Sequence, residues 1–301
     1  MVVSQQPDLS MLRGPGFLRA AACALTLAAC AVAPERDDAF NASTLAAQIQ
    51  RRPIVLLGEI HDNAPQHEAE AQALARVLEA GLRPALAFEQ FDRERQADID
   101  RVLADPDGGS KVGVERLVAL GAHGWNWNLY RPLLELALRY RLPIVAADLS
   151  RADATRVSKE GLAAVLQPER LRQLGLAPVP ADLLDAQEQA VEEGHCHEMP
   201  SHLLPGLARA QIARDATLAL SIHPYLERGV ILFTGDGHAR RDIGVPRFLP
   251  AQQRDRVISI ALIERDEAAD AVPAGAYDAV FRTAIQPRPD PCAELKKRRE
   301  M

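Results

Sequence analysis

Four apolar runs of this sequence each end in residues that can exchange protons or bind metal ions. Carboxylates and imidazoles are the usual general acids and bases of enzymes, and they also ligate divalent cations. One acidic residue in such a position would be ordinary helix capping, but five residues in equivalent positions indicate a site. The five residues that follow the runs most closely are Glu59, His61, Glu89, Asp148 and His238.

Further polar residues accompany these five. His67 follows His61 after a further turn, and Asp236 comes directly before the Gly-His pair at the fourth run. One predicted helix also carries a polar stripe, because residues three and four positions apart share a helix face. This stripe faces either solvent or the same site, and it consists of Gln211, Arg214 and Asp215.

Two kinds of chemistry suit this set of residues. In the first, two glutamates and two histidines hold a divalent cation, and a glutamate acts as general base toward a bound water. In the second, the site binds a small molecule without a metal ion. Glu59 and His61 are two residues apart, which differs from the helical spacing of the ligands in the zinc-protease motif. The metal-ligand candidates are Glu59, His61, Glu89 and His238.

Two other segments contain residues that suit a flat or metal-containing ligand. Residues 194–202 combine imidazole with cysteine and methionine sulfur, which are ligands for transition metals and haem iron. A loop with exposed histidines is the alternative for this segment. Residues 124–132 gather both tryptophans and Tyr130, which either pack in the core or form an aromatic wall for a flat ligand.

The four apolar runs are predicted strands, because continuous apolar stretches are typical of parallel strands buried on both faces. Strands alternating with helices predict an α/β fold with a mostly parallel central sheet flanked by helices. Parallel strands end at one edge of the sheet, where ligands bind, so the polar residues are expected in one crevice. The predicted strands span 53–58, 84–88, 143–147, 229–233, 256–263 and 277–281, with helices at 92–104, 111–120 and 130–140 among others.

The third and fourth predicted strands are separated by a long stretch with helical patterns and no strand signal. We therefore expect a helical insertion over 151–227 between strands three and four. The α/β core then consists of 46–150 and 228–285. The proline-rich and then basic residues 286–301 are expected to form a flexible tail.

Composition limits the classes of function. The 301 residues include 41 acidic and 35 basic side chains, which gives a net charge of −6. This chain has no basic field to neutralise a phosphate backbone, so nucleic acid is not an expected partner. Hydrophobic residues make up 48% and charged residues 25%, as in folded soluble proteins, which excludes a disordered chain and a polytopic membrane protein.

The N-terminal residues match a bacterial lipoprotein signal. Two arginines precede an apolar run over 20–29 that is too short to span a bilayer, and the four residues ending at Cys30 form a lipobox. We expect a signal peptide over 1–29, acylation of Cys30 by palmitate and related chains, and a tether over 30–45. This predicts a periplasm-facing lipoprotein of the outer membrane, whose lipid anchor is its membrane contact. Met11 is an alternative start.

Two cysteines remain in the expected mature chain, Cys196 and Cys292. The oxidising periplasm allows them to form a disulfide. Their spacing does not require one, so both the paired and the free state stay open.

Several of these motifs together resemble the ChaN-like haem-binding lipoproteins of the Tiki superfamily. The resemblance extends over about 48–285, with the motifs in the same order. Asp236 stands where most members of that family have asparagine. The motifs are Gly-Glu-Ile-His at 58–61, Phe-Glu-Gln at 88–90, and the segments 124–133, 195–200, 211–216 and 235–246.

The resemblance implies a haem-binding protein of haem and iron uptake, a carrier rather than an enzyme. It also implies two haems held face to face between two protomers, and therefore a haem-bridged homodimer with tyrosine as the iron ligand. Tyr130 is the first candidate for that ligand and Tyr225 the second. The candidates for contacts at the haem rim or propionates are His195, His197, His202 and Arg131.

The same superfamily contains metalloproteases and esterase-like enzymes that use Glu and His from the equivalent motifs. The alternative function is therefore a metal-dependent hydrolase working through the Glu/His crevice, with a divalent metal in place of haem. Metal analysis of the purified protein discriminates between the two.

Overall fold

The computed structural model of this chain describes residues 40–105, 111–264 and 272–300. The predicted signal peptide, the acylation site Cys30 and most of the predicted tether lie outside the described residues. Among the helices within them, none has the length and apolar character needed to cross a membrane.

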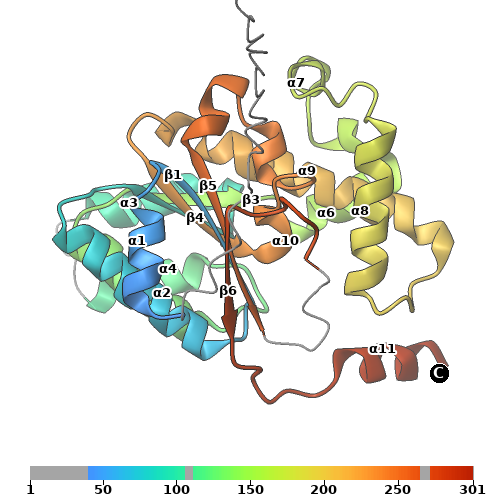
Figure 1. Cartoon of the computed structure of the whole chain (residues 1–301). Helices are drawn as coiled ribbons and strands as arrows, with labels where there is room; N and C mark the ends of the chain where they lie inside the picture. The colour runs from blue at the N-terminus through green and yellow to red at the C-terminus, as the bar shows by residue number, and fades with distance from the viewer. Residues whose placement is uncertain (1–39, 106–110, 265–271, 301) are drawn as a thin grey trace, which may run out of the picture. The chain divides into compact units, whose positions relative to one another are not determined.

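A six-stranded sheet forms the centre of the fold (Figure 1), and every pair of neighbouring strands is parallel. The prediction of an α/β fold with a central parallel sheet is confirmed. The order across the sheet is β3-β2-β4-β1-β5-β6. The strands are β1 (Ile54–Glu59), β2 (Ala85–Asp92), β3 (Ile144–Asp148), β4 (Val230–Gly235), β5 (Val257–Glu264) and β6 (Ala279–Thr283).

Helices cover both faces of the sheet, so β1 to β5 are almost wholly buried, whereas the edge strand β6 is mostly half-buried. Alternate residues of β1 show this: Val55 and Leu57 belong to one apolar cluster, whereas Ile54 and Leu56 belong to another. Covering by helices on both faces explains why the strands are continuous apolar runs. Helices of the first cluster are α1 (Ala42–Ile49), α2 (Ala64–Glu79), α3 (Gln96–Ala104), α4 (Lys111–Leu120) and α5 (Trp127–Arg139).

The opposite face is covered mainly by the helical segment between β3 and β4, and Figure 1 shows α6, α8 and α9 on that side. The longest of these helices, α9, is buried along much of its length against β3, α6 and α8. Helices of this second layer are α6 (Arg151–Glu160), α7 (Pro168–Gln173), α8 (Ala181–Gly194), α9 (Leu204–Ile222) and α10 (Asp236–Ala239).

The segments expected to be a tether and a flexible tail each contain helical residues. Residues 42–45, expected in the tether, form the first turn of α1; Asn41 caps it by accepting hydrogen bonds from the backbone N–H groups of Ser43 and Thr44. The expected C-terminal tail contains α11 (Pro291–Glu300). A disulfide between Cys196 and Cys292 ties this segment to the loop after α8, with the two Cα atoms 5.5 Å apart.

Strand order determines which residues meet at the carboxyl edge of the sheet. Although β4 is fourth in the sequence, it lies between β1 and β2 and pairs with both. The segment after β4 is thereby placed between the ends of β1 and β2, with the end of β3 next to β2. Side chains separated by up to about 180 residues of sequence therefore gather at one crevice.

Candidate functional site

Two hollows of about 450 Å³ each make up the crevice at this edge, and His61 lines both of them. The Trp125 pocket is bordered on one side by the loop before α5 and on the other by the start of α6. The His238 pocket lies between α8, α9 and α10. Residues lining the Trp125 pocket include Glu89, His123, Trp125, Asp148, Arg151 and Arg214, and those lining the His238 pocket include His195, Gln211, Asp215, Asp236 and His238.

His61 is held in a defined orientation although its side chain is 39% exposed. Its Nδ1 lies 3.0 Å from Oε1 of the buried Glu59, and its ring meets the Trp125 indole edge-on, with ring centroids 4.6 Å apart. Burial lowers the pKa of His61, but the hydrogen bond to Glu59 and the charges of Glu89 and Glu59 together outweigh it, so the net shift is upward. With Nδ1 donating to a carboxylate, Nε2 is the ring nitrogen that a ligand in the crevice can meet.

Glu89 is a buried anion held by several donors. Its Oε2 accepts hydrogen bonds from the Thr234 hydroxyl at 2.7 Å and from the Gly235 backbone N–H at 2.8 Å. Burial would raise the pKa of Glu89, but the nearby charges of His238, His61 and Arg214 lower it to about 2. Glu89 is therefore ionised across the physiological range.

His238 forms an ion pair with Asp215 from the polar stripe of α9. Its Nδ1 lies 2.7 Å from Asp215 Oδ1, and its Nε2 lies 3.8 Å from Glu89 Oε1. Gln187 donates to the other Asp215 oxygen at 3.1 Å. Burial opposes protonation of His238, but Asp215 and Glu89 raise its pKa to about 9. His238 is therefore a cation at neutral pH rather than a free base.

Asp148 is the last residue of β3, the edge strand next to β2. Its Oδ2 accepts a hydrogen bond from Arg214, whose Nη2 also lies 3.7 Å from Glu89. Burial raises the pKa of Asp148 to about 7 in spite of the neighbouring Arg214. Arg214 thus joins the ends of β2 and β3, which supports the prediction that the polar stripe of α9 faces the crevice.

Behind His61, the structure places a fully enclosed group that we call the Glu59 cluster, formed by Glu59, His67 and Glu70. Tyr130 adjoins it, and its hydroxyl donates to Glu59 Oε1 at 2.5 Å. Burial raises the pKa of Glu59 to about 7, with Glu70 adding to the shift, and raises the pKa of Glu70 to about 8. Glu59 and His67, both expected in the crevice, lie in this enclosed cluster instead.

The two tyrosines predicted as iron ligands lie outside the crevice. Tyr130 is completely buried in the core. Burial raises the pKa of its hydroxyl, and the charge of Glu59 and the hydrogen bond that the hydroxyl donates to Glu59 raise this pKa further. Tyr225 precedes β4 and therefore lies at the opposite, amino end of that strand. None of the four tyrosines, all within the described residues, lines either crevice pocket. The structure thus gives no support to a tyrosine ligand from this protomer's crevice.

Of the four residues predicted at the haem rim, the structure brings one to the crevice. His195 lines the His238 pocket, and its Nδ1 lies 2.7 Å from the Val191 carbonyl. The other three lie outside the lining of both pockets: His197 and His202 are exposed, and Arg131 makes a two-point ion pair with Glu115.

The predicted metal-ligand set does not converge on one point. Among the described residues, the group of His, Cys, Asp and Glu with ligand atoms within 4.8 Å of one another is the Glu59 cluster. Glu59 belongs to it, but the other members of the predicted set, His61, Glu89 and His238, do not.

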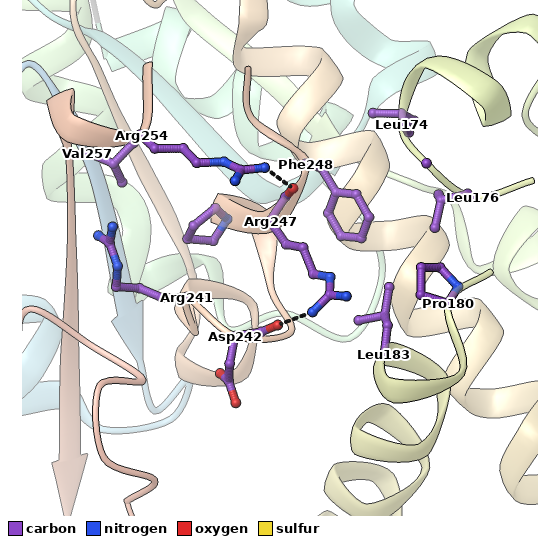
Figure 2. A pocket seen from close by; sticks show the side chains of 12 residues that line it. Leu174, Leu176, Pro180, Leu183, Arg241, Asp242, Arg247, Phe248, Arg254 and Val257 are labelled. Atoms are coloured by element: carbon purple, nitrogen blue, oxygen red, sulfur yellow. Dashed lines mark hydrogen bonds between the residues drawn. The ribbon is translucent and has the colours of Figure 1, made fainter. Parts of the chain in front are cut away.

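Sequence reasoning missed Glu70 and also a further pocket on the insertion side. This arginine pocket, of about 540 Å³, shares no lining residue with the crevice. Figure 2 shows an apolar wall facing guanidinium groups that are themselves engaged: Arg247 donates to Asp242 O at 3.0 Å, and Arg254 donates to Arg247 O at 3.4 Å. The wall consists of Leu174, Leu176, Pro180, Leu183 and Phe248.

Comparison with known proteins identifies what this arrangement is similar to. The model of the family described as haem-binding uptake, Tiki superfamily, ChaN matches residues 45–249. Among solved structures, ChaN of Campylobacter jejuni with cofacial haem is similar, with a TM-score of 0.62 and 17% identity over 79% of this chain and 90% of that one. Among curated proteins, none matches.

Two further solved structures align less closely. A mutant of the erythromycin esterase EreC in its open conformation gives a TM-score of 0.42 at 14% identity, covering 74% of this chain and 72% of that one. The type III effector HopBA1 gives 0.46 at 17% identity, covering 81% of this chain and 94% of that one. At these scores neither relative bears on the activity of this chain.

Proposed function

This chain belongs to the haem-binding uptake family ChaN of the Tiki superfamily, and on that basis we propose that it binds haem in the crevice at the carboxyl edge of the sheet. Haem supplies an iron centre that takes an axial ligand, two apolar faces and two anionic propionates. A site for it needs a donor atom, an apolar or aromatic wall and nearby cations.

The observation that carries this proposal is the position of His61. Its Nδ1 donates to a buried carboxylate, as the ligating histidines of metalloproteins commonly do, which fixes the ring and makes Nε2 more basic. Trp125 forms an aromatic wall beside it, and Arg151 in the same pocket is a cation suited to a propionate. We therefore propose His61, rather than Tyr130 or Tyr225, as this chain's ligand to haem iron.

Titration with haemin, followed at the Soret band, tests this assignment. We expect His61→Ala to change the spectrum and to weaken binding more than tenfold. Tyr225→Phe is the matched control, because its side chain lies at the opposite end of β4 and should leave spectrum and affinity unchanged. Saturable binding with the same spectrum in His61→Ala would contradict the assignment, and no binding by the wild type would contradict the function.

We further propose that the protein serves haem or iron uptake as a lipoprotein anchored through Cys30. The lipobox at the end of the N-terminal apolar run supports this, and two or more acyl chains hold a protein firmly at a membrane. Replacing Cys30 with Ala should release the protein from the membrane fraction of the cells that produce it. An unchanged distribution would count against the anchor.

A metal-dependent hydrolase in the crevice receives less support from the geometry. In the protein without a bound metal ion, Asp215 and Glu89 raise the pKa of His238 to about 9, so His238 is not a free base at neutral pH there. The Oε2 atom of Glu89 already accepts hydrogen bonds from the Thr234 hydroxyl and the Gly235 backbone N–H. These paired charges make the crevice better suited to positioning a ligand than to activating water.

A further inference from the structure

The Glu59 cluster contains polar atoms that the described residues do not satisfy. The side chains of Glu59, His67 and Glu70 are at most 2% exposed. Glu59 Oε2, His67 Nδ1 and both Glu70 oxygens have no hydrogen-bond partner there. Burying unpaired polar atoms is costly, so native proteins seldom leave several of them together.

The tautomer of His67 determines what its Nδ1 can do. Its other ring nitrogen, Nε2, lies 3.1 Å from the carbonyl oxygen of His61. A carbonyl oxygen only accepts hydrogen bonds, so Nε2 carries the proton and Nδ1 of the neutral ring carries a lone pair. The atoms nearest to this nitrogen across the cluster are Glu70 Oε2, 3.3 Å away, and Glu59 Oε2, 3.6 Å away.

Three acceptor atoms therefore face one another inside the protein, and a positive charge between them would satisfy all three. Nearby donors are already used: the Tyr130 hydroxyl and His61 Nδ1 both contact Glu59 Oε1. In the part of the chain that the structure describes, no lysine or arginine forms an ion pair with either carboxylate. With no lysine or arginine beside them, these two carboxylates must be neutralised by a proton or by a bound cation.

We propose that Glu59, His67 and Glu70 bind a divalent transition-metal ion, such as Zn²⁺, in a structural site behind the crevice. One imidazole nitrogen and two carboxylate oxygens are a donor set that zinc and its neighbours accept. Two bonds of about 2.1 Å at a tetrahedral angle place their ligand atoms about 3.4 Å apart. The observed separations of His67 Nδ1 from the two carboxylate oxygens, 3.3 and 3.6 Å, are close to that value, and the three groups offer ligand atoms within 4.8 Å of one another.

This site differs from a catalytic metal centre in being closed. Enclosed ligands give a substrate no access, so the ion would join β1 to α2 rather than activate water. Metal binding at this site also does not depend on haem, because none of the three proposed ligands lines a crevice pocket. Glu59 contacts a residue of the crevice directly through its hydrogen bond with His61.

The test compares three proteins purified without chelator and without haem: the wild type, Glu70→Gln and Glu68→Gln. Glu68 is exposed on the same helix and is the matched control. We expect about one metal ion per chain by mass spectrometry in the wild type and Glu68→Gln. In Glu70→Gln, affinity for added Zn²⁺ or Co²⁺ should fall more than tenfold, with loss of the visible Co²⁺ bands and of thermal stabilisation by metal.

Two results would overturn the proposal. Equal metal binding by all three proteins would place the ion elsewhere, for instance on the crevice histidines. Absence of binding from all three would mean that a proton neutralises the cluster. X-ray absorption of the Zn²⁺-loaded wild type is independent of variant folding: one imidazole among oxygen ligands supports the site, and two or more imidazoles refute it.

Discussion

The imidazole Nδ1 of His61 lies 3.0 Å from a carboxylate oxygen of Glu59, two residues earlier in the chain. One member of this pair is fully enclosed and the other is 39% exposed at the crevice. A buried anion at the end of β1 thus orients a ring that a ligand can reach. The remaining ring nitrogen, Nε2, is the atom that we propose to meet haem iron.

Gly235 sets the space around that nitrogen. A Cβ at position 235 would lie 2.9 Å from His61 Nε2, closer than such atoms approach in proteins. Gly235→Ala should therefore turn the ring away from Glu59, weaken haemin binding about tenfold and lower stability by about 1–3 kcal/mol. Gly237→Ala is the control, because a Cβ there would meet no atom within 4 Å. Equal haemin titrations of the two variants would contradict the role of His61.

The two tryptophans should separate binding from stability. Trp125 lines the crevice beside His61, whereas Trp127 packs on Phe91 with ring centroids 4.8 Å apart and donates to the Ala122 carbonyl. Trp127→Ala should lower the free energy of unfolding by about 3 kcal/mol. Trp125→Ala should cost less, about 1 kcal/mol, but weaken haemin binding. Urea denaturation and haemin titration of both variants check this, and the reverse pattern would exchange the two roles.

The His238–Asp215 pair should make stability depend on pH in a defined direction. The pKa of His238 is about 9 in the folded protein and near 6.5 when unfolded, so the folded state favours the protonated ring. Its contribution, about 3 kcal/mol, is complete below pH 6.5 and disappears as the pH rises through 9.

Urea denaturation of the wild type and His238→Gln measures this contribution as the difference in unfolding free energy. We expect a difference of a few kcal/mol at pH 6 that narrows by pH 9.5. A constant difference over this range would mean that His238 stabilises the fold through packing alone.

Local patterns in the sequence were sufficient to predict the fold, and of the ten residues predicted for the crevice all but Glu59 and His67 line one of its pockets. Continuous apolar runs identified the strands, and parallel pairing brought their carboxyl ends to one edge. The placement of β4 between β1 and β2 depends on contacts between distant segments, so no local pattern reports it. That placement brings His238 within 3.8 Å of Glu89.

The helical spacing of apolar residues around Tyr130 and Glu70 predicts that both side chains are buried. Tyr130 shares a helix face with Leu133, Leu134 and Ala137, at spacings of three, four and seven, which predicts a core position rather than a haem ligand. Glu70 has the same spacing from Ala73, Leu74 and Val77 of α2. A carboxylate in such an apolar stripe is a signal for a buried charged site, and the sequence interpretation passed over it.

The last prediction concerns assembly. Haem in an open crevice leaves one apolar face in water, and covering it against a second haem and protomer would remove several hundred Å² of apolar surface. At roughly 25 cal/mol per Å² this gain exceeds an association cost of several kcal/mol by a small margin. We therefore expect a monomer without haem and a concentration-dependent dimer with it. Sedimentation of the wild type and His61→Ala, with and without one equivalent of haemin, measures this. Identical monomeric profiles with haem demonstrably bound would refute the haem-bridged dimer while leaving haem binding itself intact.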